Sequence, residues 1–166
     1  QEGKVMIPFK NFLGFKKGPN GEVEIDEEQA NIVRFIYKEF LIKGKTYTAI
    51  ANELNEAGVP TPSGLEGRWL TNVIISILTN EKYKGDALLQ KRYTDNYLEH
   101  TLKRNEGELP QYYVENNHPA IIDKYEWEMV QTEIQRRKQI GKKYSASTQF
   151  ASKLICEDCG GNKKKK

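Results

Sequence analysis

Cys156 and Cys159 are the residues of this 166-residue sequence whose type and spacing most directly suggest chemistry. Two cysteines separated by two residues and followed by Gly160 and Gly161 are typical of the first half of a zinc ribbon. A tetrahedral zinc site needs four ligands, and the sequence supplies no second pair. We therefore expect no cofactor in this chain by itself and little order beyond about residue 140.

No other group of residues has the pattern of a catalytic centre. The sequence contains no Gly-rich phosphate loop, and its serines have no recognisable activating neighbour. His118 precedes Pro119 and is expected to be a hydrogen-bonded structural residue, whereas His100 lies in an acidic stretch. We assign neither histidine to metal binding or catalysis, so the residues alone predict a noncatalytic module.

A short helix predicted after Trp69 has residues suited to nucleic-acid recognition. Its outer side carries small polar side chains at its beginning, and the full set is Thr71, Asn72, Ile75, Ser76 and Thr79. In a DNA major groove Asn pairs with adenine, and Ser or Thr with several base edges. Periodicity alone favours the simpler interpretation, an ordinary surface helix with one polar face.

A basic cluster follows this helix. Lys82, Lys84, Lys91 and Arg92 are interleaved with Tyr83 and Tyr93. Lysine and arginine neutralise phosphates, and the aromatic rings can pack on sugars. An exposed strand that carries lysines to prevent edge pairing is an equally good explanation.

The charge is distributed unevenly along the chain. Residues 1–135 hold 16 Lys/Arg and 21 Asp/Glu, a net charge of −5, whereas residues 136–166 hold 10 and 2, a net charge of +8. A case for a nucleic-acid partner must therefore rest on local placement of basic residues. The sequence has no apolar run near the roughly 20 residues of a membrane span and no export signal, which predicts a cytoplasmic protein with no membrane partner.

The elements that must position these residues follow from local signals. Alternating apolar residues around the turn at 19–21 predict a β-hairpin within residues 4–25. Asp26 and Gln29 form a capping-box pattern at the start of a helix over 27–43, which Gly44 ends. Thr46 caps a second helix that stops at Gly58. These two amphipathic helices are expected to pack together as a platform.

The third helix is expected to begin near Leu70 or Thr71, with Leu70, Val73, Ile74, Ile77 and Leu78 on its apolar side. Strands are predicted over 87–89 and 111–115, with a polar arm over 94–109 that holds Lys103, Arg104 and Asn105 near its tip. Asp123 and Glu126 open a last helix with Trp127, Val130 and Ile134 on one face and basic residues 136–138 at its end. The fold class is therefore α+β, a small helix-turn-helix-like core with short antiparallel strands and a C-terminal helix.

Several segments together resemble one family. They are PFKNFLGFKKGPNGEVEID, VRFIYKEFLIKGKTYTAIANELNEAGVPTP, RWLTNVIISILTNEKYKGDALLQK, QYYVENNHPAIID and CEDCGG. In this order and spacing they are similar to the "recombinase" domain of large serine recombinases, especially those carried by transposons. The resemblance implies a recombinase domain over 1–140, a linker over 141–152 and the start of a zinc ribbon over 153–166.

The resemblance also implies a function. An upstream domain with a nucleophilic serine, which links covalently to DNA as a phosphoserine, would precede Gln1. This chain would bind double-stranded DNA at an attachment half-site during integration or excision of a mobile element. The full-length protein would carry zinc, form a dimer on DNA and form a tetramer at synapsis, whereas this chain would be a monomer.

The resemblance assigns site residues as well. Base reading would fall on Arg68, Thr71, Asn72 and Ser76, and phosphate contacts on Lys82, Lys84, Lys91 and Arg92. Family members often carry basic residues where this chain has Ile74, Ile75 and Ser76. Two alternatives stay open: a stand-alone helix-turn-helix or winged-helix transcription regulator, and a protein-interaction module, which would suit the acidic body.

Overall fold

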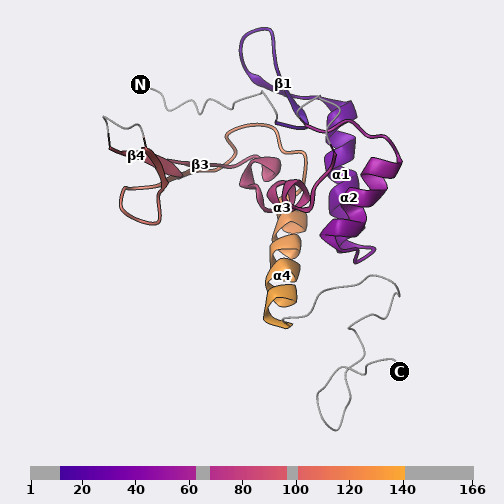
Figure 1. Ribbon diagram of the computed structural model, residues 1–166. Helices are drawn as coiled ribbons and strands as arrows, with labels where there is room; N and C mark the ends of the chain where they lie inside the picture. Colours follow the sequence, from indigo (N-terminus) through magenta and orange to yellow (C-terminus); the bar gives the residue numbers. More distant parts are fainter. Residues whose placement is uncertain (1–11, 63–67, 97–100, 141–166) are drawn as a thin grey trace.

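The structure is a computed structural model that describes residues 12–62, 68–96 and 101–140. Its helices are α1 (Glu27–Leu41), α2 (Tyr47–Glu56), α3 (Thr71–Thr79), the 3-10 helix η1 (Glu81–Lys84) and α4 (Lys124–Ile140). Its strands are β1 (Phe15–Lys17), β2 (Val23–Ile25), β3 (Ala87–Leu89), β4 (Arg92–Asn96), β5 (Thr101–Arg104) and β6 (Tyr112–Val114). In Figure 1, α1 and α2 lie on one side of α3, the strands β3 and β4 on the other, and α4 extends away from it. The predicted α+β class is confirmed.

The β1–β2 hairpin is joined directly to the start of α1. Asp26 caps the helix as predicted, because its Oδ1 accepts a hydrogen bond of 3.3 Å from the backbone N–H of Gln29. The second half of the predicted capping box is absent: the Gln29 side chain accepts from the N–H of Gly14 at 3.0 Å instead. Gly14 has φ +89°, and a Cβ there would lie 2.6 Å from Cδ1 of Ile121. The start of the β1–β2 hairpin, the first turn of α1 and Ile121, which precedes α4, therefore meet at Gly14.

The predicted platform of two helices is present. Thr46 caps α2 through a 3.1 Å hydrogen bond from the N–H of Ala49 to Oγ1. The basic end of α4 has a role beyond the expected favourable charge at a helix C-terminus. Arg137, which is buried, donates to the carbonyl oxygens of Lys45 at 2.8 Å and Phe40 at 3.3 Å, and its guanidinium lies 4.0 Å from the Phe40 ring centre. It therefore joins α4 to the end of α1.

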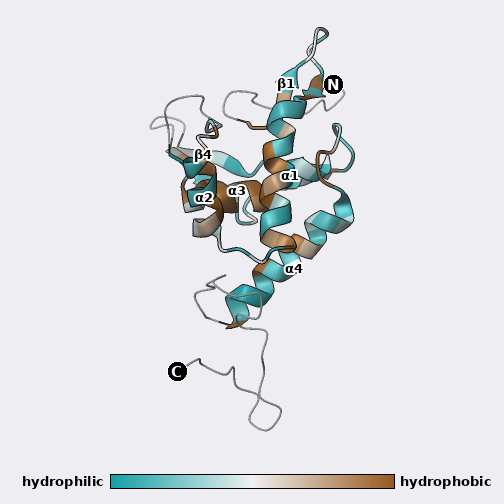
Figure 2. Ribbon diagram, turned by 90° about the vertical axis from the view of Figure 1, so that its right-hand side faces the viewer, coloured by the Kyte–Doolittle hydropathy of each residue, from teal (hydrophilic) through white to brown (hydrophobic). Residues whose placement is uncertain are grey.

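The hydrophobic core forms where the four α-helices meet, and Figure 2 shows apolar residues gathered there. Ile74, Ile77 and Leu78 bury the inner side of α3 as predicted. Leu70 does not belong to this side, because it is 53% exposed. It precedes the helix with extended backbone angles, φ −114° and ψ 154°, so the helical periodicity does not govern its direction. That part of the prediction was wrong.

The strands form three antiparallel pairs within the described residues, β1–β2, β3–β6 and β4–β5. In the β4–β5 pair Arg92 lies opposite Arg104, so Arg104 is at the base of the arm rather than near its tip. Asn105 is buried at that base, where its side-chain amide donates to the carbonyls of Gln90 and Leu109 at 2.9 and 2.8 Å. The predicted tip position of these residues was wrong, because β4 begins at Arg92, ahead of the predicted start at residue 94.

None of the helices within the described ranges combines the length and apolar character needed to cross a lipid bilayer.

Candidate nucleic-acid interface

The outward face of α3 consists of Thr71, Asn72, Ile75, Ser76 and Thr79. Asn72, Ser76 and Thr79 are exposed, as the helical periodicity predicted, while Thr71 is half-buried beside Thr48 of α2. Ile75 is 37% exposed and is an aliphatic residue among these polar ones. The face therefore presents an amide, hydroxyls and one branched aliphatic side chain, with no charge.

The N-terminal end of α3 is fixed by Asn55 of α2. The Asn55 side chain accepts from the backbone N–H of Trp69 at 2.7 Å and donates to the Trp69 carbonyl at 3.0 Å. The Trp69 ring is buried, and its Nε1 donates to the carbonyl of Val59 at 2.9 Å. These three hydrogen bonds fix the chain just before the helix begins. The sequence offered no signal for the role of Asn55, because its partner is 14 residues away.

The C-terminal end of α3 is fixed by side chains of α1 and α4. The last carbonyls of a helix have no partner within the helix. Here the Tyr37 hydroxyl donates to the carbonyl of Ile77 at 3.2 Å, and Nε2 of Gln131 donates to that of Leu78 at 2.8 Å. Burial raises the pKa of Tyr37, so its hydroxyl remains a donor. A helix held at both ends presents its outward face in one fixed orientation.

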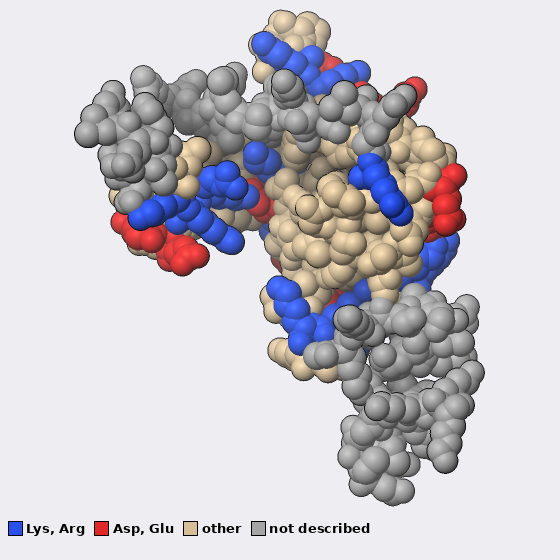
Figure 3. Space-filling model, in the orientation of Figure 1, with Lys and Arg blue, Asp and Glu red and all other residues tan. Residues whose placement is uncertain are grey.

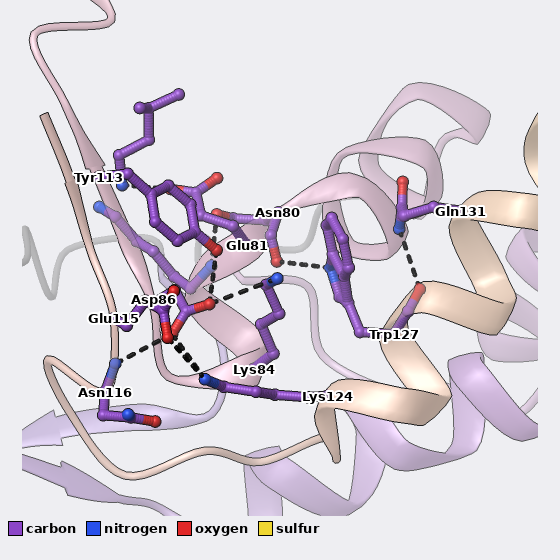
Figure 4. A network of polar contacts seen from close by, with 12 residues as sticks. Asn80, Glu81, Lys84, Asp86, Tyr113, Glu115, Asn116, Lys124, Trp127 and Gln131 are labelled. Carbon is purple, nitrogen blue, oxygen red and sulfur yellow. Dashed lines mark hydrogen bonds and ion pairs between the residues drawn. The ribbon is translucent and has the colours of Figure 1, made fainter. Parts of the chain in front are cut away.

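A polar network around Asp86 supports the segment that follows α3 (Figure 4). The Asp86 carboxylate, 2% exposed, accepts from the Tyr113 hydroxyl at 2.5 Å and the N–H of Asn116 at 3.0 Å, and lies 3.3 Å from Nζ of Lys84 and 3.7 Å from Nζ of Lys124. Burial opposes its charge, but these partners outweigh burial and hold the pKa of Asp86 below its ordinary value. The network joins η1, β6 and α4.

Lys84 belongs to this network. Its side chain is 11% exposed, and Nζ lies 4.3 Å from the centre of the Trp127 ring. Burial opposes its charge, yet Tyr113 and Asp86 keep its pKa above the ordinary value. Because its charge is satisfied within the protein, we leave Lys84 out of the candidate interface. Tyr83 is 2% exposed, so the expectation that it packs on sugars was wrong.

A groove of about 740 Å³ separates α3 from the base of the β4–β5 arm. Lys82, Lys91 and Arg104 line it together with Ser76 and Thr79. Lys91 pairs with Glu81 at 2.7 Å, and burial, followed by the nearby charge of Lys91, lowers the pKa of Lys82. An anion in this groove would reduce the repulsion between the two lysines. Arg104 was not among the predicted site residues, since only the strand register places it here.

A second groove, of about 510 Å³, lies on another flank of α3. Arg68, Asn72 and Ser76 line it, together with Pro62 and Leu70. Ser76 contributes to both grooves, so the structure brings Arg68, Asn72, Ser76, Lys82 and Lys91 to one region around α3. Arg92 is exposed on β4 opposite Arg104 and lines neither groove. Figure 3 shows a mostly uncharged central surface with a basic side chain on its right part, Lys and Arg together with acidic residues on the strands to its left, and further Lys or Arg on the hairpin above.

The remaining predictions about individual residues have different outcomes. His118 is a structural residue as expected: it is 8% exposed, and its Nε2 lies 2.6 Å from the carbonyl of Lys82, to which it donates. Cys156 and Cys159, the predicted half zinc site, lie outside the described residues, as do the linker and His100.

Comparison with protein families assigns the chain. A family model described as Recombinase matches residues 27–137, which include α1 to α3, most of α4, the β3–β6 pair and the residues of both grooves other than Phe12 and Leu13. The chain therefore belongs to the recombinase family.

Two solved structures have the same fold over most of this chain. One, described as "Crystal Structure of a LSR-DNA Complex", where LSR denotes a large serine recombinase, has a TM-score of 0.53 at 20% identity and covers 90% of this chain. Another, from work on "Sequence Requirements of the Listeria innocua prophage attP site", has a TM-score of 0.51 at 19% identity and covers 96%. The chain spans only 40% and 55% of these two chains, respectively.

Proposed function

We propose that this chain is a DNA-binding region of a large serine recombinase and recognises an attachment half-site in duplex DNA. The observation that carries the proposal is the outward face of α3, where Asn72 and Ser76 are exposed on a helix fixed at both ends. Its uncharged polar groups suit base edges, and the flanking cations suit phosphates.

The helical shape of the α3 face and the cations on its two flanks support duplex DNA as the partner. An α-helix fits the major groove of B-DNA, whose walls are lines of phosphates. The cations beside α3 lie on both of its flanks, with Arg68 in one groove and Lys82, Lys91 and Arg104 in the other. A helix inserted between two phosphate strands would place these cations near both strands. Two carboxylates, Glu81 and Glu106, also line the groove that holds Lys82, where Glu81 pairs with Lys91.

The recombination chemistry is proposed to reside elsewhere in the parent protein. Among the described residues, the polar networks serve the fold, and we assign no nucleophile to them. The phosphoserine mechanism, the zinc at Cys156 and Cys159, and assembly into a dimer on DNA and a tetramer at synapsis remain predictions from the sequence resemblance. A stand-alone regulator is less favoured, because the matched family is that of recombinases.

The direct test measures binding of the full 166-residue chain to duplex DNA at several salt concentrations. The probe is a duplex selected by the protein from a pool with about 20 randomised base pairs, compared with a shuffled duplex of the same composition. With roughly four phosphate contacts, log Kd should change with log salt with a slope near 4. The selected duplex should bind at least about tenfold more tightly than the shuffled one.

Two results would count against the proposal. No affinity for either duplex at low salt would refute DNA binding and favour the protein-interaction module. Equal affinity for both duplexes with a steep salt slope would leave nonspecific DNA binding and refute half-site recognition. Lys138→Ala is a matched control, because Lys138 is exposed at the far end of α4, away from α3, and its loss should leave the salt slope unchanged (Figure 1).

A further inference from the structure

Two exposed aliphatic residues stand on the surface that would meet DNA. Ile75, in the middle of α3, is 37% exposed, and Leu70, just before the helix, is 53% exposed. Neither side chain is part of the hydrophobic core or of the residues packed against it. Ile75 lies on the same face as Asn72, three residues earlier, and Thr79, four residues later, because these spacings bring side chains together on a helix.

Within α3 itself no residue has the side chain that favours guanine, and Arg68, which lines a groove with Asn72, precedes the helix. The sequence of α3 is TNVIISILT, so the helix carries neither Arg nor Lys. Recognition of guanine in the major groove is dominated by Arg or Lys, which donate to O6 and N7. The groups present are an amide, hydroxyls and an aliphatic side chain. These match the major-groove edge of an A·T pair, which offers N7 and the N6 amino group of adenine and the 5-methyl group of thymine.

We propose that α3 selects A·T base pairs, with Asn72 bonded to an adenine and Ile75 in contact with the methyl group of a thymine. This inference rests on the proposed function and adds the class of sequence that the helix accepts. The fixed ends of α3 matter here, since contact with a single methyl group requires a defined distance between helix and base. The uncharged centre of the face allows this close apolar contact without the burial of an unpaired charge.

The experiment replaces thymine by deoxyuridine, which removes the methyl group and leaves the hydrogen-bonding groups unchanged. The full chain is bound to its selected duplex and to versions in which each thymine is replaced in turn. At one position or more, the wild-type chain should lose about fourfold in affinity, as expected for one buried methyl group. The Ile75→Ala variant should bind the two versions equally at that position.

A matched control is the Ile42→Ala variant. Ile42 is also an exposed isoleucine, at 70%, but it follows α1 rather than lying on α3. It should keep the full fourfold difference between the thymine and deoxyuridine duplexes. The wild-type comparison requires no substitution in the protein, so a folding defect in a variant cannot produce or hide the main effect.

Three outcomes would overturn the inference. The wild-type chain could bind all deoxyuridine duplexes as tightly as the parent duplex while still rejecting the shuffled one; this would remove the methyl contact and leave DNA recognition intact. Ile75→Ala could keep the wild-type ratio, which would assign the methyl contact to another residue. A chain that binds no duplex at low salt would refute the proposed function itself, a result distinct from the first two.

Discussion

The outward face of α3 and the network around Asp86 lie next to each other in the sequence and differ in how their polar groups are used. In the network, Asp86 has four partners within the protein, and Lys84 is enclosed by Asp86, Tyr113 and Trp127. On α3, Asn72 and Ser76 are exposed to solvent. Polar groups that are satisfied inside a protein stabilise its fold, whereas exposed ones on a rigid element can bind a partner.

The two regions also depend on each other. The Trp127 ring, which lies over Lys84, donates through Nε1 to the carbonyl of Asn80 at 3.3 Å, directly after α3. Two residues further along, Nε2 of His118 likewise donates to a backbone carbonyl, that of Lys82. The network thus fixes the segment by which the outward face of α3 is connected to Lys82 and Lys91. Substitutions in the two regions should therefore have separable effects, on stability for one and on DNA binding for the other.

The largest expected effect is that of Lys84→Met, which keeps the volume of the side chain and removes its charge. Asp86 would keep Tyr113, Asn116 and Lys124 but lose its nearest cation, at a cost of about 2 kcal/mol in the free energy of unfolding. Urea denaturation measures this loss, with Lys138→Met as the exposed control. The salt slope of DNA binding by the folded variant should not change; a slope lower by one would return Lys84 to the phosphate contacts.

Arg104→Ala should have the opposite effects: it should weaken DNA binding and leave the stability of the fold nearly unchanged. Arg104 is exposed at the base of the β4–β5 arm, so its removal should change the free energy of unfolding by less than about 0.5 kcal/mol. If it contacts a phosphate, the salt slope of DNA binding should fall by about one, and all duplex sequences should be weakened equally. Salt titrations with the selected and shuffled duplexes test both statements. An unchanged slope would limit the proposed contacts in this groove to Lys82 and Lys91.

The smallest effect concerns the pH dependence of stability through His118. Burial lowers the pKa of this side chain below its ordinary value of 6.5, although the Lys82 carbonyl opposes the shift. Below pH 6.5 the unfolded chain therefore binds a proton that the folded chain does not, and stability is lost as the pH falls toward the folded pKa. Between pH 7 and pH 6 the free energy of unfolding should therefore fall, by no more than about 0.7 kcal/mol, the limit for a histidine that titrates only in the unfolded chain.

The measurement is the free energy of unfolding at both pH values for the wild-type chain and for His118→Gln. The free energy of unfolding of the variant should fall less between pH 7 and pH 6 than that of the wild-type chain, while the salt slope of DNA binding stays the same. A pH dependence identical in the two proteins would show that His118 titrates alike in the folded and unfolded states.

Local signals in the sequence were sufficient for most of the fold. Asp26 and Thr46 cap the helices that were expected, because capping depends on residues only three positions apart. The inner and outer sides of α3 follow from a period of 3.6 residues, which identified Asn72 and Ser76 as exposed. The same period wrongly placed Leu70 on the inner side, because Leu70 precedes α3 and the period holds only inside the helix.

The charged residues could not be placed in the same way. Lys84 lies in a 3-10 helix and is enclosed by β6 and α4, so its burial depends on segments about 30 to 45 residues away in the chain. Tyr83, in the same helix, stacks with Phe12 and Phe15, about 70 residues earlier. Arg104 enters the groove beside Lys82 only through the β4–β5 register, which the sequence did not reveal. Arg137 donates to the carbonyl of Phe40, 97 residues earlier, so local sequence signals could not predict its role either. Long-range contacts, rather than residue type, decide which cations remain exposed.

The most direct test of the central claim, that α3 reads bases, is the sequence preference of the Asn72→Ala variant. Affinities are measured for the selected duplex and for all single base-pair substitutions of it, at one salt concentration. Loss of the Asn72 amide should remove discrimination worth about 1–3 kcal/mol at one A·T position and preserve the preference elsewhere. Equal weakening at every position, or no change at all, would contradict the account.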